Sequence, residues 1–483
     1  MLTKSKLLIS SQCSRRLWLL VNHPELQEED PNSAIKIKAG NEVGALARSL
    51  YPDGIEVKTL NKSEALTHTK EIMAKQSNQP IFEAAFEVNN VLVRVDLLIP
   101  EKEGYRLVEV KGSSSEKPYY LEDIAVQTWV MREAGIAPTK SCLSHINSNF
   151  VYQGNNQYKD FFAEVDLTNK IEEHVSLVGQ WINNANATLE LKEEPKDIKI
   201  GAHCSNPFIC SFIKHCSSFE NPTEYPISIL PRAGKLINEL KAEGYEDVRD
   251  IPEDRLTNDN HIRVRRISKS GKAELNPEAK KELNGLPYPR YYLDFETISY
   301  VAPKVPNTKP FCQIPFQWSC HIQDKDKKIT HKEYLNIENV DPRREFALSL
   351  VNLLKDAKTI FVYSSFEKSR INELAELFPD LKEDLNLIVD KLYDLLNLTR
   401  DHYYHPDMKG SWSIKKVLPT LSNLNYSELI VQNGSHAQVA YMDLMDPKTS
   451  EEEKKIIKNN LLKYCELDTY AMLEITKGFE TFQ

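Results

Sequence analysis

Three charged side chains inside strand-like sequence are the residues here most suited to chemistry. Asp96 precedes, and Glu109 and Lys111 follow, the segment 101–104, which predicts the turn of a β-hairpin. Successive strand side chains alternate between faces, so Glu109 and Lys111 share one face. A carboxylate buried in a sheet needs a cation or hydrogen bonds to offset the loss of water. Mg²⁺ prefers carboxylates with water and phosphate oxygens, and a nearby lysine holds the attacking water, so the pattern predicts a nuclease metal site.

The hairpin leaves more than one interpretation open. Alternation predicts Asp96 on the face opposite Val93, Val95 and Leu97. An exposed acid beside a surface ion pair is the alternative to a metal site, because such residues recur by chance in charged chains. Glu83, in the preceding strand-like run, is a further candidate, although a solvent-facing strand glutamate explains it better.

A second acidic group lies in the C-terminal part of the chain. Asp294 and Glu296 follow an aromatic run and share a strand face by the same alternation. Tyr464 and Asp468 are four residues apart on a predicted helix and therefore share one of its faces. Two carboxylates at the first spacing suit paired metal ions, and a strand edge with charges facing water is the alternative.

Four cysteines are candidates to bind a metal. Cys13 lies near the start of the chain, and Cys204, Cys210 and Cys216 follow one another at intervals of six. Four thiolates are the number that a tetrahedral zinc ion or a cubane iron–sulfur cluster requires. The spacing does not choose between these metals, and free thiols remain a third interpretation.

These residues require strands and helices to position them. Helices are predicted at 34–50, 62–75 and 119–134, and strands at 81–88, 141–147 and 290–299. Their order predicts an α/β fold. A length of 483 residues predicts two or three domains, which we place at residues 1–220 and 286–483, with a helical connector at 221–285. The connector carries a basic run that is a candidate phosphate-binding surface or a solvated linker face: Arg263, Arg265 and Arg266.

Composition restricts the class of protein. With 41% hydrophobic and 27% charged residues, the chain is typical of globular proteins. It has no apolar run long enough to span a membrane, and its start lacks the apolar core of a signal peptide, so we expect a cytoplasmic protein without a membrane partner. The net charge of −9 argues against a broadly basic surface, but it allows a local basic groove.

The first acidic group resembles the PD-(D/E)XK nucleases of the RecB family. Asp96, twelve intervening residues and the motif E-V-K ending at Lys111 match that pattern, and Gln127 matches the family's glutamine. The resemblance implies a restriction-endonuclease-like domain in which Asp96 and Glu109 bind Mg²⁺ or Mn²⁺, with Lys111 and Gln127 completing the catalytic set. The sequence departs from that family at two positions, with Glu42 in place of a histidine and Met131 in place of a tyrosine.

The cysteine pattern is similar to that of iron–sulfur nucleases, which include the CRISPR-associated RecB-like exonucleases. In those proteins a lone N-terminal cysteine and a C-terminal triplet enclose the nuclease core. The resemblance implies a [4Fe-4S] cluster on Cys13, Cys204, Cys210 and Cys216 that joins the ends of the domain, with Zn²⁺ as the alternative.

The second acidic group resembles the DEDD exonucleases of the RNase H-like, DnaQ-type fold, in their tyrosine subtype. The resemblance implies metal ions bound by Asp294, Glu296 and Asp468 and a water oriented by Tyr464. We favour Glu367 as the middle acid, because a serine there can cap its helix, although the family has aspartate; Asp394 is the alternative. The segments 290–299 and 410–419 also resemble an uncharacterised bacterial domain that often follows a RecB-like nuclease.

These expectations describe a protein with two nuclease modules that cut phosphodiesters with Mg²⁺ or Mn²⁺. We expect a DNA exonuclease in repair, processing or defence, with RNA as the other substrate. The chain has no G-x-x-x-x-G-K-[ST] motif, so it should need single strands, free ends or a helicase partner. The alternative is a nucleic-acid-binding or assembly protein in which one or both sites are degenerate.

Overall fold

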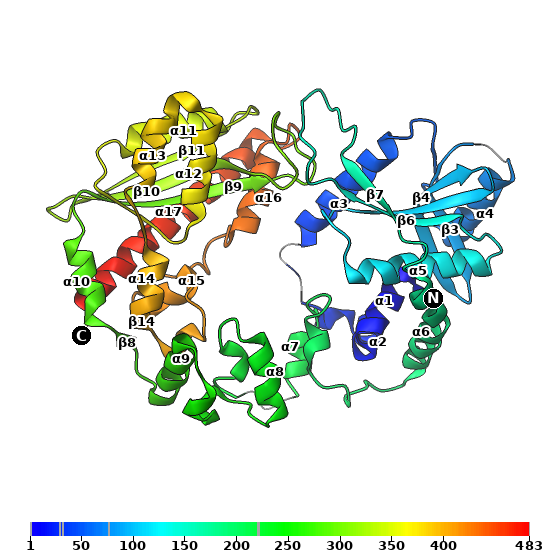
Figure 1. Ribbon diagram of the computed structural model, residues 1–483, viewed down its shortest axis with the longest axis horizontal. Coiled ribbons are helices and arrows are strands. Elements are labelled where there is room, and N and C mark those ends of the chain that lie inside the picture. The colour runs from blue at the N-terminus through cyan, green and yellow to red at the C-terminus, as the bar shows by residue number, and fades with distance from the viewer. Residues whose placement is uncertain (1, 29, 31–32, 76–77, 220–222, 483) are drawn as a thin grey trace. The chain divides into compact units, whose positions relative to one another are not determined.

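The chain divides into two compact units that are described separately below. The computed structural model describes residues 2–28, 30, 33–75, 78–219 and 223–482 (Figure 1). Unit 1 comprises Met1–Asn221 and Tyr300–Cys312, and unit 2 comprises Pro222–Ser299 and Gln313–Gln483. The expected boundary between residues 220 and 221 lies outside the described residues. Both units combine sheets and helices, so the predicted α/β class is confirmed, and none of the helices described could cross a bilayer.

Unit 1 is built on a mixed sheet with the strand order β2-β3-β4-β5-β6-β7, in which β1 also pairs with β4. The strands are β1 (Leu2–Thr3), β2 (Ile55–Glu56), β3 (Ile81–Val88), β4 (Val91–Glu101), β5 (Gly104–Lys111), β6 (Lys140–Ile146) and β7 (Phe162–Asp166). The antiparallel pair β4 and β5 confirms the predicted hairpin, and β5 continues into a parallel pair with β6.

Helices cover both faces of this sheet. They are α1 (Lys4–Gln12), α2 (Ser14–Asn22), α3 (Ser33–Ser49), α4 (Lys62–Ala74), α5 (Pro118–Glu133), α6 (Glu172–Glu190) and α7 (Ile213–Ser217). On one face α5 packs through Ile124 and Val130 into the main core of the unit. On the other face Ala47 of α3 packs against Phe82 and Leu97.

The regular alternation of β3 and β4 breaks beside the first acidic group. Val93 and Val95 lie in the core under α5, whereas Leu97 lies in the cluster under α3, so the prediction that these three share a face is wrong. Glu83, in the strand paired with β4, has a left-handed backbone with φ of 56°. Such a conformation interrupts the alternation of a strand, so that the side chains after it lie on the opposite face of the sheet from the one expected. This explains the change of face at Asp96.

Unit 2 is built on a five-stranded sheet with the order β11-β10-β9-β12-β13 and a separate pair of β8 and β14. The strands are β8 (Glu274–Leu275), β9 (Arg290–Ser299), β10 (Gln313–Gln323), β11 (Ile329–Leu335), β12 (Thr359–Val362), β13 (Leu392–Asp394) and β14 (Tyr403–Tyr404). The strand β10 is antiparallel to both β9 and β11, whereas β12 runs parallel to β9 and β13. The strand predicted at 290–299 is confirmed.

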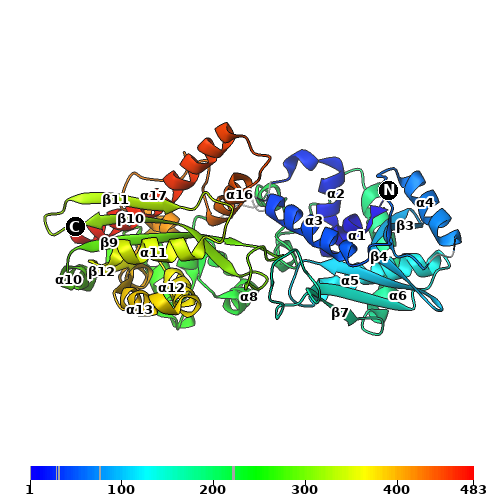
Figure 2. The same ribbon diagram turned by 90° about the horizontal axis from the view of Figure 1, so that it is seen from above.

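The helices of unit 2 lie on both faces of its sheet. They are α8 (Gly234–Ala242), α9 (Asp259–Ser270), α10 (Pro277–Gly285), α11 (Arg343–Leu354), α12 (Phe366–Leu377), α13 (Lys382–Val389), α14 (Leu395–His402), α15 (Ile414–Val417), α16 (Gly434–Leu444) and α17 (Glu451–Thr481). Figure 2 shows α11, α12 and α13 on one face and α17 on the other. Leu293 and Phe295 of β9 pack toward α11, α12 and α13. Tyr292 packs in the core that includes Met472 of α17. Even-numbered side chains of β9 therefore point toward α17.

The helices α8, α9 and α10, which fall in the predicted connector, belong to unit 2. Leu240, Val264 and Leu283 share one apolar core with Phe361 of the sheet and Phe479 of α17. These helices thus extend the scaffold of the second acidic group.

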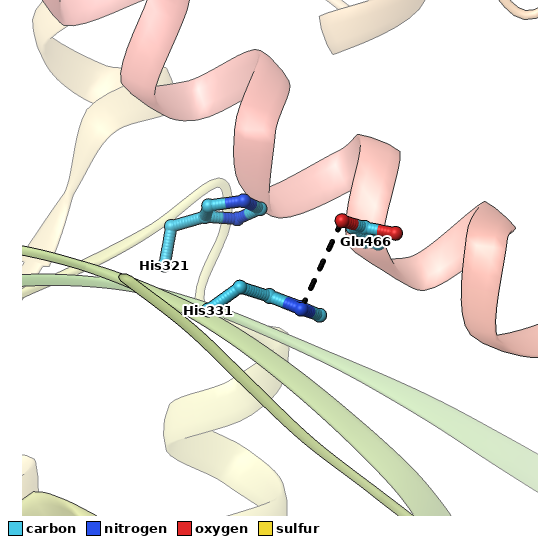
Figure 3. A group of neighbouring side chains, drawn as sticks. All are labelled: His321, His331 and Glu466. Atoms are coloured by element: carbon cyan, nitrogen blue, oxygen red, sulfur yellow. Dashed lines mark ion pairs between the residues drawn. The ribbon is translucent and has the colours of Figure 1, made fainter. Parts of the chain in front are cut away.

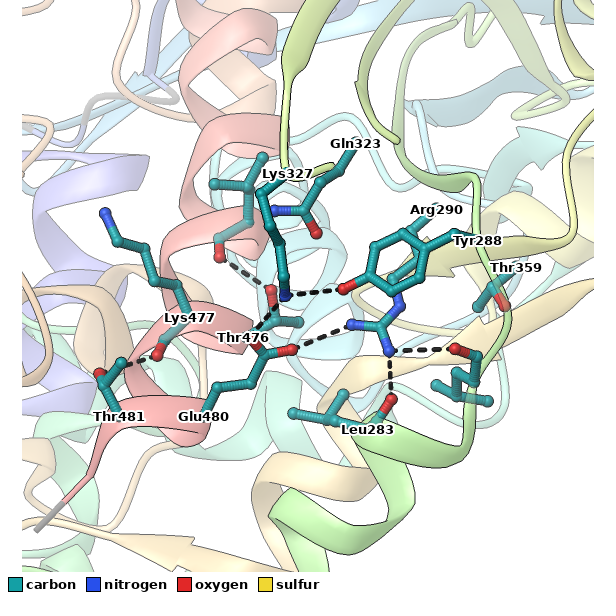
Figure 4. Close-up of polar contacts among 12 residues, drawn as sticks. Leu283, Tyr288, Arg290, Gln323, Lys327, Thr359, Thr476, Lys477, Glu480 and Thr481 are labelled. Carbon is teal, nitrogen blue, oxygen red and sulfur yellow. Dashed lines mark hydrogen bonds and ion pairs between the residues drawn. The ribbon is translucent and has the colours of Figure 1, made fainter. Parts of the chain in front are cut away.

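A buried arginine joins the start of β9 to the end of α17 (Figure 4). Arg290 is 1% exposed and donates to the carbonyl oxygens of Leu283 and Leu286 and, at 3.0 Å, to Glu480 Oε1. Lys327 also donates to Glu480, at 3.0 Å. The guanidinium therefore fixes α17 against the strand that carries the acids.

Candidate functional site

Four carboxylates from three elements of unit 2 form the principal candidate site. Asp294 and Glu296 leave the α17 face of β9, Glu367 lies in the first turn of α12, and Asp468 lies on α17. Glu296, Glu367 and Asp468 are 6%, 3% and 7% exposed. The acids and tyrosine predicted from three distant parts of the sequence thus lie close enough in unit 2 to shift one another's pKa values.

The acids of this cluster raise one another's pKa. Burial, and then Asp468, Glu367 and Glu296, raise the pKa of Asp294 well above its usual range. Burial and nearby acids likewise raise the pKa of Glu367 to about 8, and burial raises that of Asp468 to about 6. Carboxylates this close together are stable only when they bind protons or divalent cations. These carboxylate oxygens therefore fit metal ions.

Asp394, the alternative middle acid, has a different role. Its carboxylate accepts from the backbone N–H groups of Leu396 and Asn397, at 2.9 and 3.4 Å, and so caps α14. Glu367 instead has a buried Oε2 without a hydrogen-bond partner among the described residues. Glu367, unlike Asp394, is also among the acids that raise the pKa of Asp294 and of Glu296, which favours Glu367 as the ligand.

Tyr426 and Lys415 also belong to this site, and the sequence analysis missed both. The Tyr426 hydroxyl donates to Asp468 Oδ1 at 2.6 Å, and Lys415 Nζ lies 3.5 Å from the Tyr464 hydroxyl. Lys415 also lies over the rings of Tyr426 and Tyr464, at 5.0 and 5.2 Å from their centroids. No spacing rule connects residues 415 and 426 to the acids, because a long irregular segment brings them there.

Cys465 is the remaining polar group beside the acids. Its Sγ lies 3.6 Å from Asp294 Oδ2, and Asp294, Glu296 and Cys465 offer ligand atoms within 4.8 Å of one another. Burial and Asp294 raise the pKa of this thiol, so it stays protonated and donates to the carboxylate.

The first acidic group of unit 1 forms a compact network of ion pairs. Lys111 Nζ lies 2.6 Å from Glu109 Oε1 and 2.5 Å from Asp123 Oδ2, and Lys4 Nζ lies 3.0 Å and 2.7 Å from the same two side chains. Gln127 donates to Glu109 Oε2 at 2.7 Å. The three predicted residues are brought together, and Lys4 and Asp123 complete a closed ring of charges. Asp123 lies four residues before Gln127 on α5, a spacing that could have indicated it.

Asp96 lies at the edge of this network. Its Oδ2 accepts from Val110 N at 2.7 Å, where the β4–β5 ladder has already ended. Burial and then Glu109 raise the pKa of Asp96 to about 8, whereas Lys111 and Lys4 overcome burial and hold the pKa of Glu109 below its usual range. A cavity of about 290 Å³ opens beside Asp96 and Glu83 under α3, with room for a hydrated ion.

The two positions that depart from the RecB family have structural partners. Glu42 pairs with Lys304 at 3.2 Å, within unit 1. Met131 is fully buried in the core on α5. Neither side chain contributes to the ring of charges around Glu109.

The four cysteines gather at one end of unit 1. Cys13 separates α1 from α2 in an extended conformation, and Cys204, Cys210 and Cys216 lie in one cluster with Trp18. Burial, and also neighbouring thiols, raise the pKa of Cys13 and Cys216. Among the residues described, no three of these sulfur atoms fall within 4.8 Å of one another.

The basic run of the connector binds its own unit. Arg263 donates to the carbonyl oxygens of residues 400 and 401, at 2.5 and 2.6 Å. Arg265 contacts Ile251 O, and Arg266 donates to both oxygens of Glu274 at 2.7 Å. Many of the arginine N–H groups that were predicted to bind phosphates therefore bind other residues of unit 2.

Part of the second acidic group lies in a segment that matches a family model. Residues 291–413 match a family described as a domain of unknown function, DUF2779. This range includes the acids on β9 and α12 and ends before α17.

The chain is similar to uncharacterized proteins of small bacteria. It is 32% identical over 219 residues to the uncharacterized protein MG366 of Mycoplasma genitalium, covering 41% of this chain and 32% of the relative. It is 29% identical over 210 residues to the uncharacterized protein UU173 of Ureaplasma parvum, covering 38% and 30%. The matched stretch thus spans about a third of these relatives' own length. Among solved structures, none matches the chain.

Proposed function

We propose that the chain is a metal-dependent nuclease whose principal site is the four-acid cluster of unit 2. The observation that carries this proposal is the set of buried carboxylates with raised pKa values on β9, α12 and α17. Such a set is costly to ionise without cations, and two divalent ions would remove that cost. Phosphodiester hydrolysis is the reaction that most often requires this arrangement.

The sheet topology of unit 2 supports an RNase H-like exonuclease. Three antiparallel strands followed by two parallel ones, with the first pair of acids on the central β9, is the arrangement expected for that fold. Asp294, Glu296 and Asp468 would hold the ions, with Glu367 as the fourth acid. Tyr464 would orient the attacking water, with Lys415 beside its hydroxyl. Bound ions would supply stabilisation of charge on the attacking and leaving oxygens.

Unit 1 supports a restriction-endonuclease-like module of the RecB type. The hairpin β4–β5, the parallel partner β6 and the helix α5 with Gln127 match the expected order of elements. Asp96 and Glu109 would bind Mg²⁺ or Mn²⁺ beside Lys111. The four cysteines would hold a [4Fe-4S] cluster, with Zn²⁺ as the alternative, in a cytoplasm that keeps thiols reduced.

We propose DNA with free or single-stranded ends as the substrate, with RNA as the other candidate. No ATP-binding loop accompanies the acids, so a helicase partner would be needed on long duplexes. Repair, processing and defence are all consistent with such an activity.

Cleavage of end-labelled single-stranded DNA, duplex DNA and RNA with Mn²⁺ tests the proposal. We expect Asp294→Asn to lower cleavage by at least about 100-fold, because a metal ligand is lost. Asp326→Asn is the control, since this acid is exposed in the turn between β10 and β11. Equal activity of Asp294→Asn and the parent would exclude unit 2 as the nuclease.

A second candidate role applies to unit 1, which would bind nucleic acid without cutting it. Lys4 and Lys111 neutralise Glu109 and Asp123, so the acids that could bind a metal already have cationic partners. Asp96→Asn distinguishes the roles: an enzyme loses one product pattern, whereas a binding module keeps every product. Asp166→Asn, an exposed acid on β7, is its control.

A further inference from the structure

Two histidines and a glutamate meet between the β10–β11 hairpin and α17 of unit 2 (Figure 3). His321 lies on β10, His331 lies opposite it on β11, and Glu466 projects from α17. The imidazole centroids are 4.6 Å apart, and His331 Nδ1 lies 3.8 Å from Glu466 Oε1. Each of the three offers one ligand atom, and these atoms lie within 4.8 Å of one another.

Hydrogen bonds fix which nitrogen of each imidazole is free. Thr469 Oγ1 lies 3.0 Å from the carbonyl oxygen of Glu466, which can only accept, so the threonine hydroxyl donates there. Thr469 therefore accepts from Ser319 Oγ at 3.0 Å and from His321 Nδ1 at 2.8 Å. The serine proton is then used, so Ser319 accepts from His331 Nε2 at 2.9 Å.

This proton inventory leaves a lone pair on His321 Nε2 and another on His331 Nδ1. These lone pairs exist when both imidazoles are neutral, which is the form that binds metal. Burial, and then His331, lower the pKa of His321 to about 4, in agreement with a neutral ring. In metal sites the second nitrogen of a ligating histidine usually donates to an acceptor, and here the hydroxyls of Ser319 and Thr469 accept.

We propose that His321, His331 and Glu466 bind a divalent transition-metal ion, Zn²⁺, that joins α17 to the β10–β11 hairpin. Two imidazoles and one carboxylate suit Zn²⁺ better than Mg²⁺, which prefers oxygen ligands. Zinc bonds of ~2.0 Å place ligand atoms about 3.3 Å apart, so the ligands must close slightly. Glu466 has a side chain 48% exposed and can make that movement, and water would complete the tetrahedron.

This site would be independent of the proposed nuclease activity. Glu466 lies two residues from both Tyr464 and Asp468, so it leaves α17 on nearly the opposite side from them. A bound ion would hold the helix that carries those residues without contacting the four acids.

Zinc content of the purified full-length chain tests the proposal. After loading with Zn²⁺ and desalting, we expect His331→Asn and Glu466→Gln each to retain about one zinc fewer per chain than the parent. Other zinc ligands, including the cysteines, contribute equally to every variant. The matched controls are His23→Asn and Glu474→Gln, an exposed histidine outside the cluster and an acid further along α17. Equal zinc contents in all five proteins would overturn the proposal.

Chemical protection provides a second measurement that needs no variant. Diethyl pyrocarbonate modifies accessible, neutral imidazoles, and peptide mass spectrometry identifies the modified residue. We expect Zn²⁺ to protect His331, whose side chain is 23% exposed, and to leave His23 reactive. Equal modification of His331 with and without Zn²⁺ contradicts a metal at this position.

The hydroxyl network can be tested separately. Ser319→Ala removes the partner of His331 Nε2 and keeps all three ligands. We expect this change to weaken zinc binding by about 10- to 100-fold in a competition titration, while Thr399→Ala, a buried threonine on α14, leaves it unchanged. Unchanged affinity in Ser319→Ala would show that the ring is not held for a metal.

Discussion

Glu367 and Asp394 are neighbouring acids of unit 2, yet their surroundings give them opposite properties. The Asp394 carboxylate receives backbone N–H groups at the start of α14. Glu367 is 3% exposed and has one oxygen without a partner among the described residues. At the scale of a residue, the capacity to bind a cation therefore depends on which hydrogen bonds are already made.

The raised pKa values predict how metal-free stability depends on pH. Glu367 and Asp96 have pKa values raised to about 8, so between pH 6.5 and 8 the folded state holds protons that the unfolded state has lost. Stability must then fall as pH rises through this window, by about 1 to 2 kcal/mol for each carboxyl. Urea unfolding with a chelator measures this fall, and Glu367→Gln should remove part of it. Mn²⁺ should stabilise the parent more at pH 8 than at pH 6.5, because it competes with those protons.

Tyr426→Phe tests the hydrogen bond that the sequence analysis missed. Its hydroxyl donates to Asp468 and so lowers the pKa of that acid. We expect Mn²⁺-dependent cleavage to fall about 10-fold or more. The acidic side of the pH profile of cleavage should move to higher pH. Tyr403→Phe, which loses a buried hydroxyl bonded to Thr420, is the control. An unchanged pH profile would contradict a role for Tyr426 at Asp468.

At the scale of an element, a buried arginine joins the end of α17 to β9. Arg290→Met leaves two carbonyl oxygens without this donor and leaves Glu480 with Lys327 as its partner. We expect a loss of about 3 to 5 kcal/mol in the free energy of unfolding. Lys327→Met removes a partly exposed contact to the same glutamate and should cost about 1 kcal/mol or less. Urea unfolding of both variants gives the comparison, and equal losses would contradict the special role of Arg290.

The sequence predicted these elements well where the pattern was local. Alternation and turn residues indicated β4, β5 and β9, and a spacing of four placed Tyr464 and Asp468 on one helix. The alternation rule predicted the wrong face for Leu97. Glu83, on the paired strand β3, has a left-handed backbone that interrupts the alternation at this point. Lys4 could not have been foreseen, since tertiary contacts alone bring the first helix to Glu109.

At the scale of the whole molecule, unit 1 is discontinuous in the sequence. Residues 300–312 connect two strands of unit 2 but belong to unit 1. Ala302 is fully buried in a cluster with Val43 and Phe161. The Tyr158 hydroxyl donates to the carbonyl oxygen of residue 303 at 2.9 Å. The segment therefore completes a core that the first 221 residues leave open.

Ala302→Asp tests this dependence in the full chain. A charge placed in that apolar cluster should destabilise unit 1 by several kcal/mol. Hydrogen exchange should accelerate in peptides covering residues 146–162, and peptides from α17 should be unaffected. Lys304→Ala, which changes a side chain 51% exposed on the same segment, is the control. Exchange that is equal in both variants would contradict a structural role for residues 300–312.

The discontinuity of unit 1 also has a consequence during synthesis on the ribosome. The first 221 residues emerge well before residue 312 exists, and translation at roughly 5 to 20 residues per second makes that interval roughly 5 to 18 s. Throughout it the nascent chain exposes the apolar surface that Ala302 later covers. Chaperone binding to this surface should therefore end only when the loop between β9 and β10 has left the ribosome, so unit 1 matures only after the first part of unit 2 has been made.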